Sequence, residues 1–154
     1  MISAASQTLA ELLTQELAQI SQEQISFEHP RLWQKDKPGL NLYCYHVQEV
    51  DCVTNSNQRW FELTFLISAT DYTSLGEQSL LSNVLMRLSQ YPSLPEAVLD
   101  QSLRGFGAVG MRVFTQALAE DVQFWAVLRT PLQLALHVTL TVPYPMLRQA
   151  GLVS

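Results

Sequence analysis

Cys44 and His46 are the neighbouring residues with the clearest potential for metal chemistry. They stand two apart in a segment with alternating side chains, so both are predicted to lie on one face of a strand, with Cys52 beyond them. Thiolate and imidazole are ligands that zinc prefers, but no fourth ligand follows at a familiar spacing. Cysteine also packs readily as a small buried apolar residue. We therefore interpret the cysteines as structural and predict no metal and no cofactor.

Residues 105–110 match the glycine spacing of a dinucleotide-binding loop, G-x-G-x-x-G. Glycines at these positions let backbone amides approach a pyrophosphate when a strand precedes the loop and a helix follows it. Here a short helical turn is expected before the segment and a strand after it. This order is typical of a flexible connector, so we predict no nucleotide site.

Glu49, Asp51 and Glu62 are the carboxylates that a hairpin could bring together. A converging pair of carboxylates can act in acid–base catalysis or bind a hard cation. Solvated loop and edge charges explain these residues equally well, since sequence alone sets no such geometry. The nucleophile-elbow sequence G-x-S-x-G, which would indicate a hydrolase, does not occur. We predict no catalytic residue and a protein that is not an enzyme.

The composition favours a protein whose surfaces are covered by partners. The 154 residues are 47% hydrophobic and only 15% charged, against a usual charged share of about 25%. The net charge is −5 and the basic residues are dispersed, which argues against nucleic-acid binding because phosphate neutralisation needs clustered cations. The N-terminus resembles no signal peptide, and no apolar run is long enough for a bilayer. We therefore expect a cytoplasmic protein without direct membrane insertion.

Apolar periodicity predicts the elements that position these groups. Helical spacing of leucines indicates an amphipathic helix over about residues 4–20, and alternation indicates strands over 40–50, 59–69 and 132–142. The weaker signals are a short strand at Ile25 and Phe27, a helical turn from Pro95 to Leu103, a strand around 109–113 and a helix over 118–128.

Residues 74–77 carry a capping-box sequence at a change from strand to helix. A Ser74 hydroxyl at the N-cap can accept the amide of the third helical residue, and Glu77 there can reach back to the serine amide. The predicted helix continues through Leu88 and is stopped by Pro92.

The order helix, three strands, helix, strand, helix, strand predicts one α/β domain of the α+β type over residues 1–142. The sheet is expected to be mixed and mainly antiparallel, with helices packed mostly on one face, because alternating strands are half exposed. Residues 143–154 are predicted to form an extended C-terminal tail.

Aromatic and apolar side chains supply the candidate protein-interface residues. Aromatic residues on the strands and in the loop before them can form a recognition face, and apolar anchors on the tail can dock on another protein. These candidates are Trp33, Tyr43, Tyr45, Trp60, Tyr144, Leu147 and Leu152.

Several segments taken together resemble one known family. They are 6–13 (SQTLAELL), 40–43 (LNLY), 63–69 (LTFLISA), Glu77 with Leu80 and Leu81, 124–125 (FW) and 129–132 (RTPL). Their order and spacing, from about Ile2 to Val142, are similar to those of the tail-terminator, or cap, proteins of phage-tail-like contractile injection systems.

This resemblance implies a structural, non-enzymatic component of a particle. It implies a homohexameric ring on the distal end of the inner tube and sheath, with the inner tube protein, the sheath protein and further copies of itself as partners. Such a ring ends head-to-tail growth because it matches the terminal ring on one side and offers no continuing surface on the other.

A second hypothesis is a small α/β enzyme or ligand-binding domain that uses the polar face of the sheet. Its candidate residues are His46, Glu62 and His137, which could line a cleft. Bound zinc or a ligand-induced thermal shift would favour this hypothesis over the cap.

Overall fold

The computed structural model describes residues 1–51 and 58–144. Three α-helices, three short 3₁₀ helices and five strands make up this part of the chain. In order they are α1 (Ile2–Glu16), η1 (Gln22–Gln24), β1 (Ile25–Ser26), β2 (Gly39–Val50), β3 (Trp60–Thr70), α2 (Ser74–Leu88), η2 (Glu96–Val98), η3 (Gln101–Leu103), β4 (Gly110–Phe114), α3 (Leu118–Leu128) and β5 (Ala135–Pro143).

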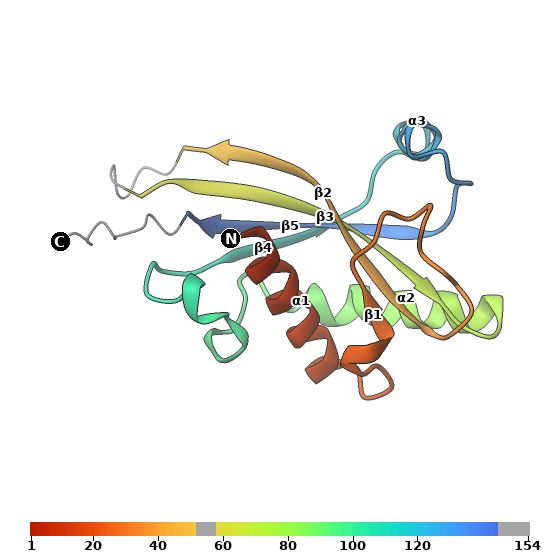
Figure 1. Ribbon diagram of the computed structural model, residues 1–154, viewed down its shortest axis with the longest axis horizontal. Coiled ribbons are helices and arrows are strands. Elements are labelled where there is room, and N and C mark those ends of the chain that lie inside the picture. The colour runs from red at the N-terminus through yellow and green to blue at the C-terminus, as the bar shows by residue number, and fades with distance from the viewer. Residues whose placement is uncertain (52–57, 145–154) are drawn as a thin grey trace.

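The five strands form one mixed sheet in the order β1-β2-β3-β5-β4. Only β1 and β2 are parallel, and the other neighbours are antiparallel. Helices α1 and α2 lie below the sheet and α3 lies above it, near one end (Figure 1). We call the side covered by α1 and α2 the first face and the side that carries α3 the second face. The predicted α+β fold, with its mainly antiparallel sheet and helices mostly on one face, is confirmed.

The first face holds the aliphatic core. Alternate residues of β3, β5 and β2 point into it, including the fully buried Phe65, Val138 and Leu42. They pack against buried leucines of α1 and against the stripe of α2 that contains Leu81 and Val84. The alternating apolar residues of the strands thus pack against the helically spaced apolar residues of α1 and α2, as the sequence predicts.

The second face is also largely closed, although most of its residues are polar or aromatic and Leu66 is its fully buried aliphatic residue. Thr64, Ser68, His137 and Thr139 are buried there, and Trp125 of α3 is 2% exposed. A further cover comes from the segment after β1, because the Asn41 side chain accepts from the Glu28 amide at 3.0 Å and donates to the Glu28 carbonyl at 2.8 Å.

Helix α2 begins one residue earlier than the capping-box prediction, which is wrong in this detail. Thr73 is the N-cap, and its hydroxyl accepts from the Gly76 amide at 3.0 Å. Thr73 has the extended backbone that an N-cap needs, whereas Ser74 is already helical. Glu77 therefore lies one position too far along the helix to complete a box with the cap.

Two element boundaries also differ from the prediction. α1 ends at Glu16 rather than near residue 20, because Leu17 has extended backbone, yet Leu17 and Ile20 still join the core. β5 begins at Ala135 rather than at 132, and Leu132 and Leu134 are exposed in the segment before it. At the other end, Pro143 still pairs with Trp60, so the sheet includes the first residue of the expected tail.

Candidate functional site

The predicted pair of metal ligands is divided between the two faces of the sheet. A β-bulge shifts the register of β2 between Cys44 and His46. Cys44 lies opposite Phe65 and His46 lies opposite Thr64, and consecutive residues of β3 point to opposite faces. The prediction that Cys44 and His46 share a face is therefore wrong. Burial also raises the pKa of the Cys44 thiol, which disfavours the thiolate that a metal needs. Cys52 lies outside the described residues.

The three candidate carboxylates do not converge. Glu49 lies opposite Phe61 and Glu62 lies opposite Gln48, so the two glutamates point to opposite faces. Glu49 instead accepts two hydrogen bonds from the Arg59 guanidinium, both at 3.0 Å, and this partner holds the pKa of Glu49 below its ordinary value. Asp51 is exposed at the end of β2. These positions explain the charges as solvated groups at a hairpin.

The glycine-rich segment connects η3 to β4, in the order that the sequence predicts. Gly105 and Gly107 have φ angles of 89° and 103°, a left-handed backbone that side chains rarely adopt. The segment forms one wall of an open hollow of about 410 Å³. The hollow is also lined by Val50, Trp60 and Thr141. The glycines are therefore needed for the left-handed turn in this segment. A strand and not a helix follows the segment, so it lacks the helix N-terminus that binds a pyrophosphate.

His137 is the centre of a closed polar and aromatic cluster on the second face. Its Nδ1 lies 2.8 Å from the Tyr45 hydroxyl, and its Nε2 lies 3.6 Å from Oδ1 of Asp121 on α3. Phe114 stacks on the ring with a centroid distance of 5.2 Å, and Phe124 meets it edge-on at 5.5 Å. The imidazole is 2% exposed. This arrangement is a packed contact between α3 and the sheet.

The surroundings of His137 and Tyr45 favour the neutral forms of these two side chains. Burial lowers the pKa of His137, although the nearby Asp121 carboxylate opposes that effect. Burial, Asp121 and Cys44 together raise the pKa of Tyr45 to about 12, so its hydroxyl keeps its proton. We assign the ring proton of His137 to Nε2, facing Asp121, so that Nδ1 accepts from Tyr45. The cluster is thus suited to hold α3 in place.

The residues of the second hypothesis are not brought together in an open cleft. His46 is exposed, Glu62 is half-buried and His137 is buried under α3. Across the ladder, His46 lies opposite Thr64 whereas His137 lies opposite Leu66. A substrate could not reach the His137 ring while α3 stays docked.

The predicted interface residues lie in three places. Tyr45 belongs to the His137 cluster. Tyr43 contacts the His29 ring on the side of the segment after β1, where Trp33 also lies. Trp60 and Tyr144 lie at the hairpin end, where Trp60 is buried and the Tyr144 amide donates to the Arg59 carbonyl. Leu147 and Leu152 lie outside the described residues.

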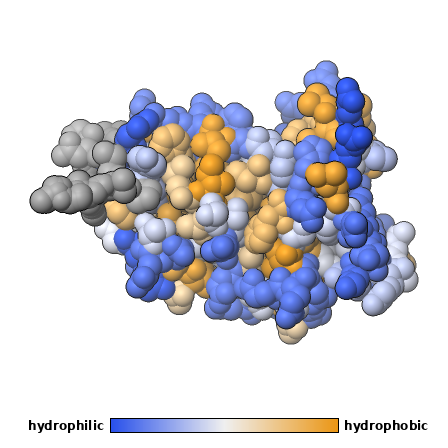
Figure 2. Space-filling model, in the orientation of Figure 1, coloured by the Kyte–Doolittle hydropathy of each residue, from blue (hydrophilic) through white to orange (hydrophobic). Residues whose placement is uncertain are grey.

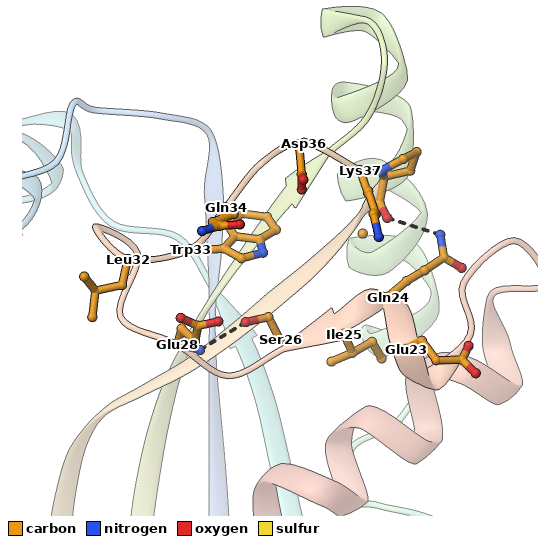
Figure 3. A pocket seen from close by; sticks show the side chains of 12 residues that line it. Glu23, Gln24, Ile25, Ser26, Glu28, Leu32, Trp33, Gln34, Asp36 and Lys37 are labelled. Atoms are coloured by element: carbon orange, nitrogen blue, oxygen red, sulfur yellow. Dashed lines mark hydrogen bonds between the residues drawn. The ribbon is translucent and has the colours of Figure 1, made fainter.

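Trp33 lines a hollow of about 390 Å³ between β1 and the loop that leads to β2 (Figure 3). Acidic Glu23, Glu28 and Asp36 line it with Lys37. Within it, the Gln24 side chain donates to the Pro38 carbonyl at 3.2 Å and the Glu28 amide donates to the Ser26 hydroxyl at 3.3 Å. These bonds hold the two ends of the loop that carries Trp33.

The sequence predictions miss two exposed helix faces. Leu75 and Met86 on α2 are 75% and 61% exposed, and Val122 and Val127 on α3 are 51% and 82% exposed. A signal for them is present, because Leu75 and Met86 lie eleven residues apart on the side of α2 opposite its core stripe. A prediction based only on the core-facing stripe of a helix does not identify these exposed apolar residues.

Helices in the described residues are all too short or too polar to cross a bilayer.

Comparisons with known proteins place the fold. The chain matches the family described as the Pvc16 N-terminal domain over residues 4–150. It resembles the sheath/tube terminator, in its extended state, of PVC, an extracellular contractile injection system, with a TM-score of 0.68 and 16% identity over 93% of this chain and 56% of that chain. It also resembles the tube-terminating cap of the anti-feeding prophage AFP, with a TM-score of 0.61 and 15% identity over 90% of this chain and 53% of that chain.

The chain thus spans a little over half the length of these two structures, and at such identities the likeness shows a shared fold. A comparison with curated proteins gives no match.

Proposed function

From the premise that this chain belongs to the Pvc16 N-terminal domain family, we propose that it is a structural cap that ends the tube and sheath of a contractile injection system. The observation that carries the proposal is the family match over residues 4–150. It is supported by a fold shared over at least nine-tenths of the chain with two proteins that are named as terminators of such particles.

The cap acts as a ring of six copies on the distal end of the inner tube and sheath. Tube and sheath subunits add head to tail and would continue to add, whereas a cap binds the last ring and presents a surface to which no further subunit fits. A ring also repeats each weak contact around its circumference, so a single interface can be modest. The ring assembles on the particle in the cytoplasm, and nucleic acid and membrane are not partners.

The cap is structural and not catalytic. The support is that His137, the residue most suited to acid–base chemistry, is enclosed by α3 and hydrogen-bonded to Tyr45. Glu49 is likewise paired with Arg59. Neither group has the free position beside a substrate that catalysis needs.

Contacts with tube and sheath come from the aromatic surface and the tail. Trp33 and Tyr43 present partly exposed rings on the second face, and Tyr144 is 39% exposed where the chain leaves the sheet. The tail that follows the domain of residues 1–142 docks on a neighbouring subunit or sheath protein through Leu147 and Leu152. Apolar side chains that are isolated in water gain stability from such docking.

The test is to add the purified protein to growing tube and sheath and to measure particle lengths and end density by negative-stain microscopy. We expect shorter particles, each with a ring at one end. An unrelated acidic protein of similar size is the control. A strictly monomeric protein that never binds a tube or sheath end would refute the proposal.

The tail is tested by deleting residues 145–154. We expect end binding to fall while the circular dichroism and the unfolding midpoint stay unchanged. Unchanged capping would reject the docking role of the tail without affecting the cap itself.

A further inference from the structure

The outward side of α2 carries no charge. Its outermost residues, opposite the core stripe of Leu80, Val84 and Leu88, repeat at helical spacing. These outermost residues are Leu75, Ser79, Ser82 and Met86, and all four are exposed. A solvated helix normally carries charged residues on this side. We call these four residues the α2 outer face.

The outward side of α3 is more apolar, and its one charged residue, the exposed Glu120, lies at the edge on the same side as Val127. The helix uses Asp121, Phe124, Trp125 and Leu128 to meet the sheet. The opposite residues are Ala119, Val122, Gln123 and Ala126, with Leu118 and Val127 at the sides, and all six are exposed. Apolar side chains lie at the surface over this helix (Figure 2). We call these six residues the α3 outer face.

The two outer faces point in opposite directions. The buried residues of α2 pack into the first-face core, whereas α3 packs on His137 of the second face. α2 and α3 therefore lie on opposite sides of the sheet, as the ribbon shows (Figure 1). A contact between two different patches on opposite sides of one molecule is head to tail. Repeated, it builds a ring or a filament and not a closed dimer.

We propose that the α3 outer face of one copy packs on the α2 outer face of the next copy around the cap ring. This inference rests on the proposed ring function and names its subunit contact. A second copy is the occupant because one chain supplies two helix faces with uncharged centres on opposite sides of its sheet. The small residues Ser79, Ser82, Ala119 and Ala126 let two helices approach to about 8–10 Å between their axes.

The packed faces match in length and in chemistry. α3 has 11 residues and is about 16 Å long, and it fits within the 15-residue α2, which is about 22 Å long. Leu75 and Met86 lie near the two ends of the α2 outer face, and Leu118 and Val127 lie at the sides of the α3 outer face. The centres of the two faces bring no charge, and Glu120 at the edge of the α3 outer face can keep its hydration, so the contact avoids the largest cost of burial.

The first test uses disulfide formation with Ser82→Cys and Val122→Cys in a Cys44→Ala/Cys52→Ala background. With both new cysteines in one chain, oxidation should give a ladder of covalent multimers up to the closed ring. Either cysteine alone should give monomers, because each meets a different residue on the next copy. Covalent dimers from Val122→Cys alone would reveal a symmetric α3–α3 contact and overturn the proposal.

The second test uses charge. Val122→Glu alone should weaken ring formation by at least about tenfold, measured by analytical ultracentrifugation, because it places an unpaired carboxylate in the contact. Val122→Glu combined with Ser82→Lys should restore much of the loss, since each glutamate then meets a lysine of the next copy. Leu32→Glu, an exposed apolar residue on the loop before β2, is the matched control and should leave the ring intact. A double variant as weak as the single one would overturn the contact.

The outcomes for the contact and for the cap are separable. A covalent ladder from a protein that never binds tube or sheath ends supports the contact and refutes the cap. Crosslinking is also repeated on the capped particle. If the protein binds tube or sheath ends but gives no covalent ladder there, the cap function stands and the α3–α2 contact is refuted. Ser82, Val122 and Leu32 are exposed, and circular dichroism of each variant, including the Cys44→Ala/Cys52→Ala background, checks that the fold is retained.

Discussion

The two faces of the sheet are closed by different chemistry. The first face is covered by α1 and α2 with aliphatic side chains, and its strand residues Phe65, Leu140 and Val138 are fully buried. The second face is covered in part by α3, through Trp125 and the hydrogen-bonded His137. The helices on the first face have 15 residues each and pack through aliphatic side chains. Helix α3 on the second face has 11 residues and packs through aromatic and polar side chains.

This difference separates stability from function. Aliphatic burial scales with area, so the first face supplies most of the free energy of folding. The polar cluster beneath α3 has a small net effect, because its hydrogen bonds replace bonds to water, but it sets the orientation of the helix. α3 can therefore present an apolar outer surface without serving as the main support of the fold.

Removing Phe65 should give the largest effect. Phe65→Ala empties a fully buried position in the first-face core and should lower the free energy of unfolding by about 3–5 kcal/mol. Urea denaturation followed by circular dichroism measures the loss. A loss below about 1 kcal/mol would mean that the first face does not dominate stability.

Removing Trp125 should have a smaller global effect and a large local one. Trp125→Ala deletes the largest buried side chain of α3, but α3 can open without the rest of the sheet, which limits the global loss to less than about 3 kcal/mol. Hydrogen exchange should show lost protection in α3 and unchanged protection in β3. Loss of protection in both elements together would show that the two faces unfold as one unit.

The first face could be predicted almost entirely from the sequence. Alternating apolar residues in β3 and β5 and the leucines of α1 report directly on burial, because one period corresponds to one face. Errors there are confined to ends, such as Thr73 in place of Ser74 at the α2 cap. End positions depend on single backbone angles that periodicity does not encode.

The second face could not be predicted in this way. The bulge near Tyr45 exchanges the faces of all later residues of β2. The resulting shift in the alternation is hard to recognise, because Val47 is apolar but Glu49, the next residue on the same face, is charged. The alternation predicts His137 on the polar face of the last strand, where it could line a cleft, but α3 buries it. Which helix covers a polar face is a tertiary property, and so is the outward position of Val122 on that helix.

The hydrogen bond between Tyr45 and His137 tests how the second face is held. Tyr45→Phe keeps the ring contact with Phe124 but leaves Nδ1 of His137 buried without its donor. We expect a loss of about 1–3 kcal/mol, smaller than that of Phe65→Ala, because one buried acceptor loses its partner. Urea denaturation measures it, and His46→Gln at an exposed site of the same strand is the control. A neutral result would mean that aromatic packing alone holds α3.

Acidification should loosen α3 selectively, with the smallest effect of the four. The pKa of His137 lies below its ordinary value of 6.5, chiefly because of burial, so the docked state prefers the neutral ring. When α3 opens, the ring binds a proton more readily. The contribution of His137 is therefore fully present above pH 6.5 and is lost as the pH falls from there through the lowered pKa.

Hydrogen exchange of α3 at several pH values, corrected for intrinsic rates, measures this dependence, and His137→Gln should remove it. Asp121 provides the opposing effect, because its carboxylate attracts a charged ring from 3.6 Å. If protection of α3 rises on acidification, that attraction outweighs burial and the ring is charged in the docked state. The second face would then be held by an ion pair between His137 and the partly exposed Asp121. It would differ from the aliphatic first face even more than it does with a neutral His137.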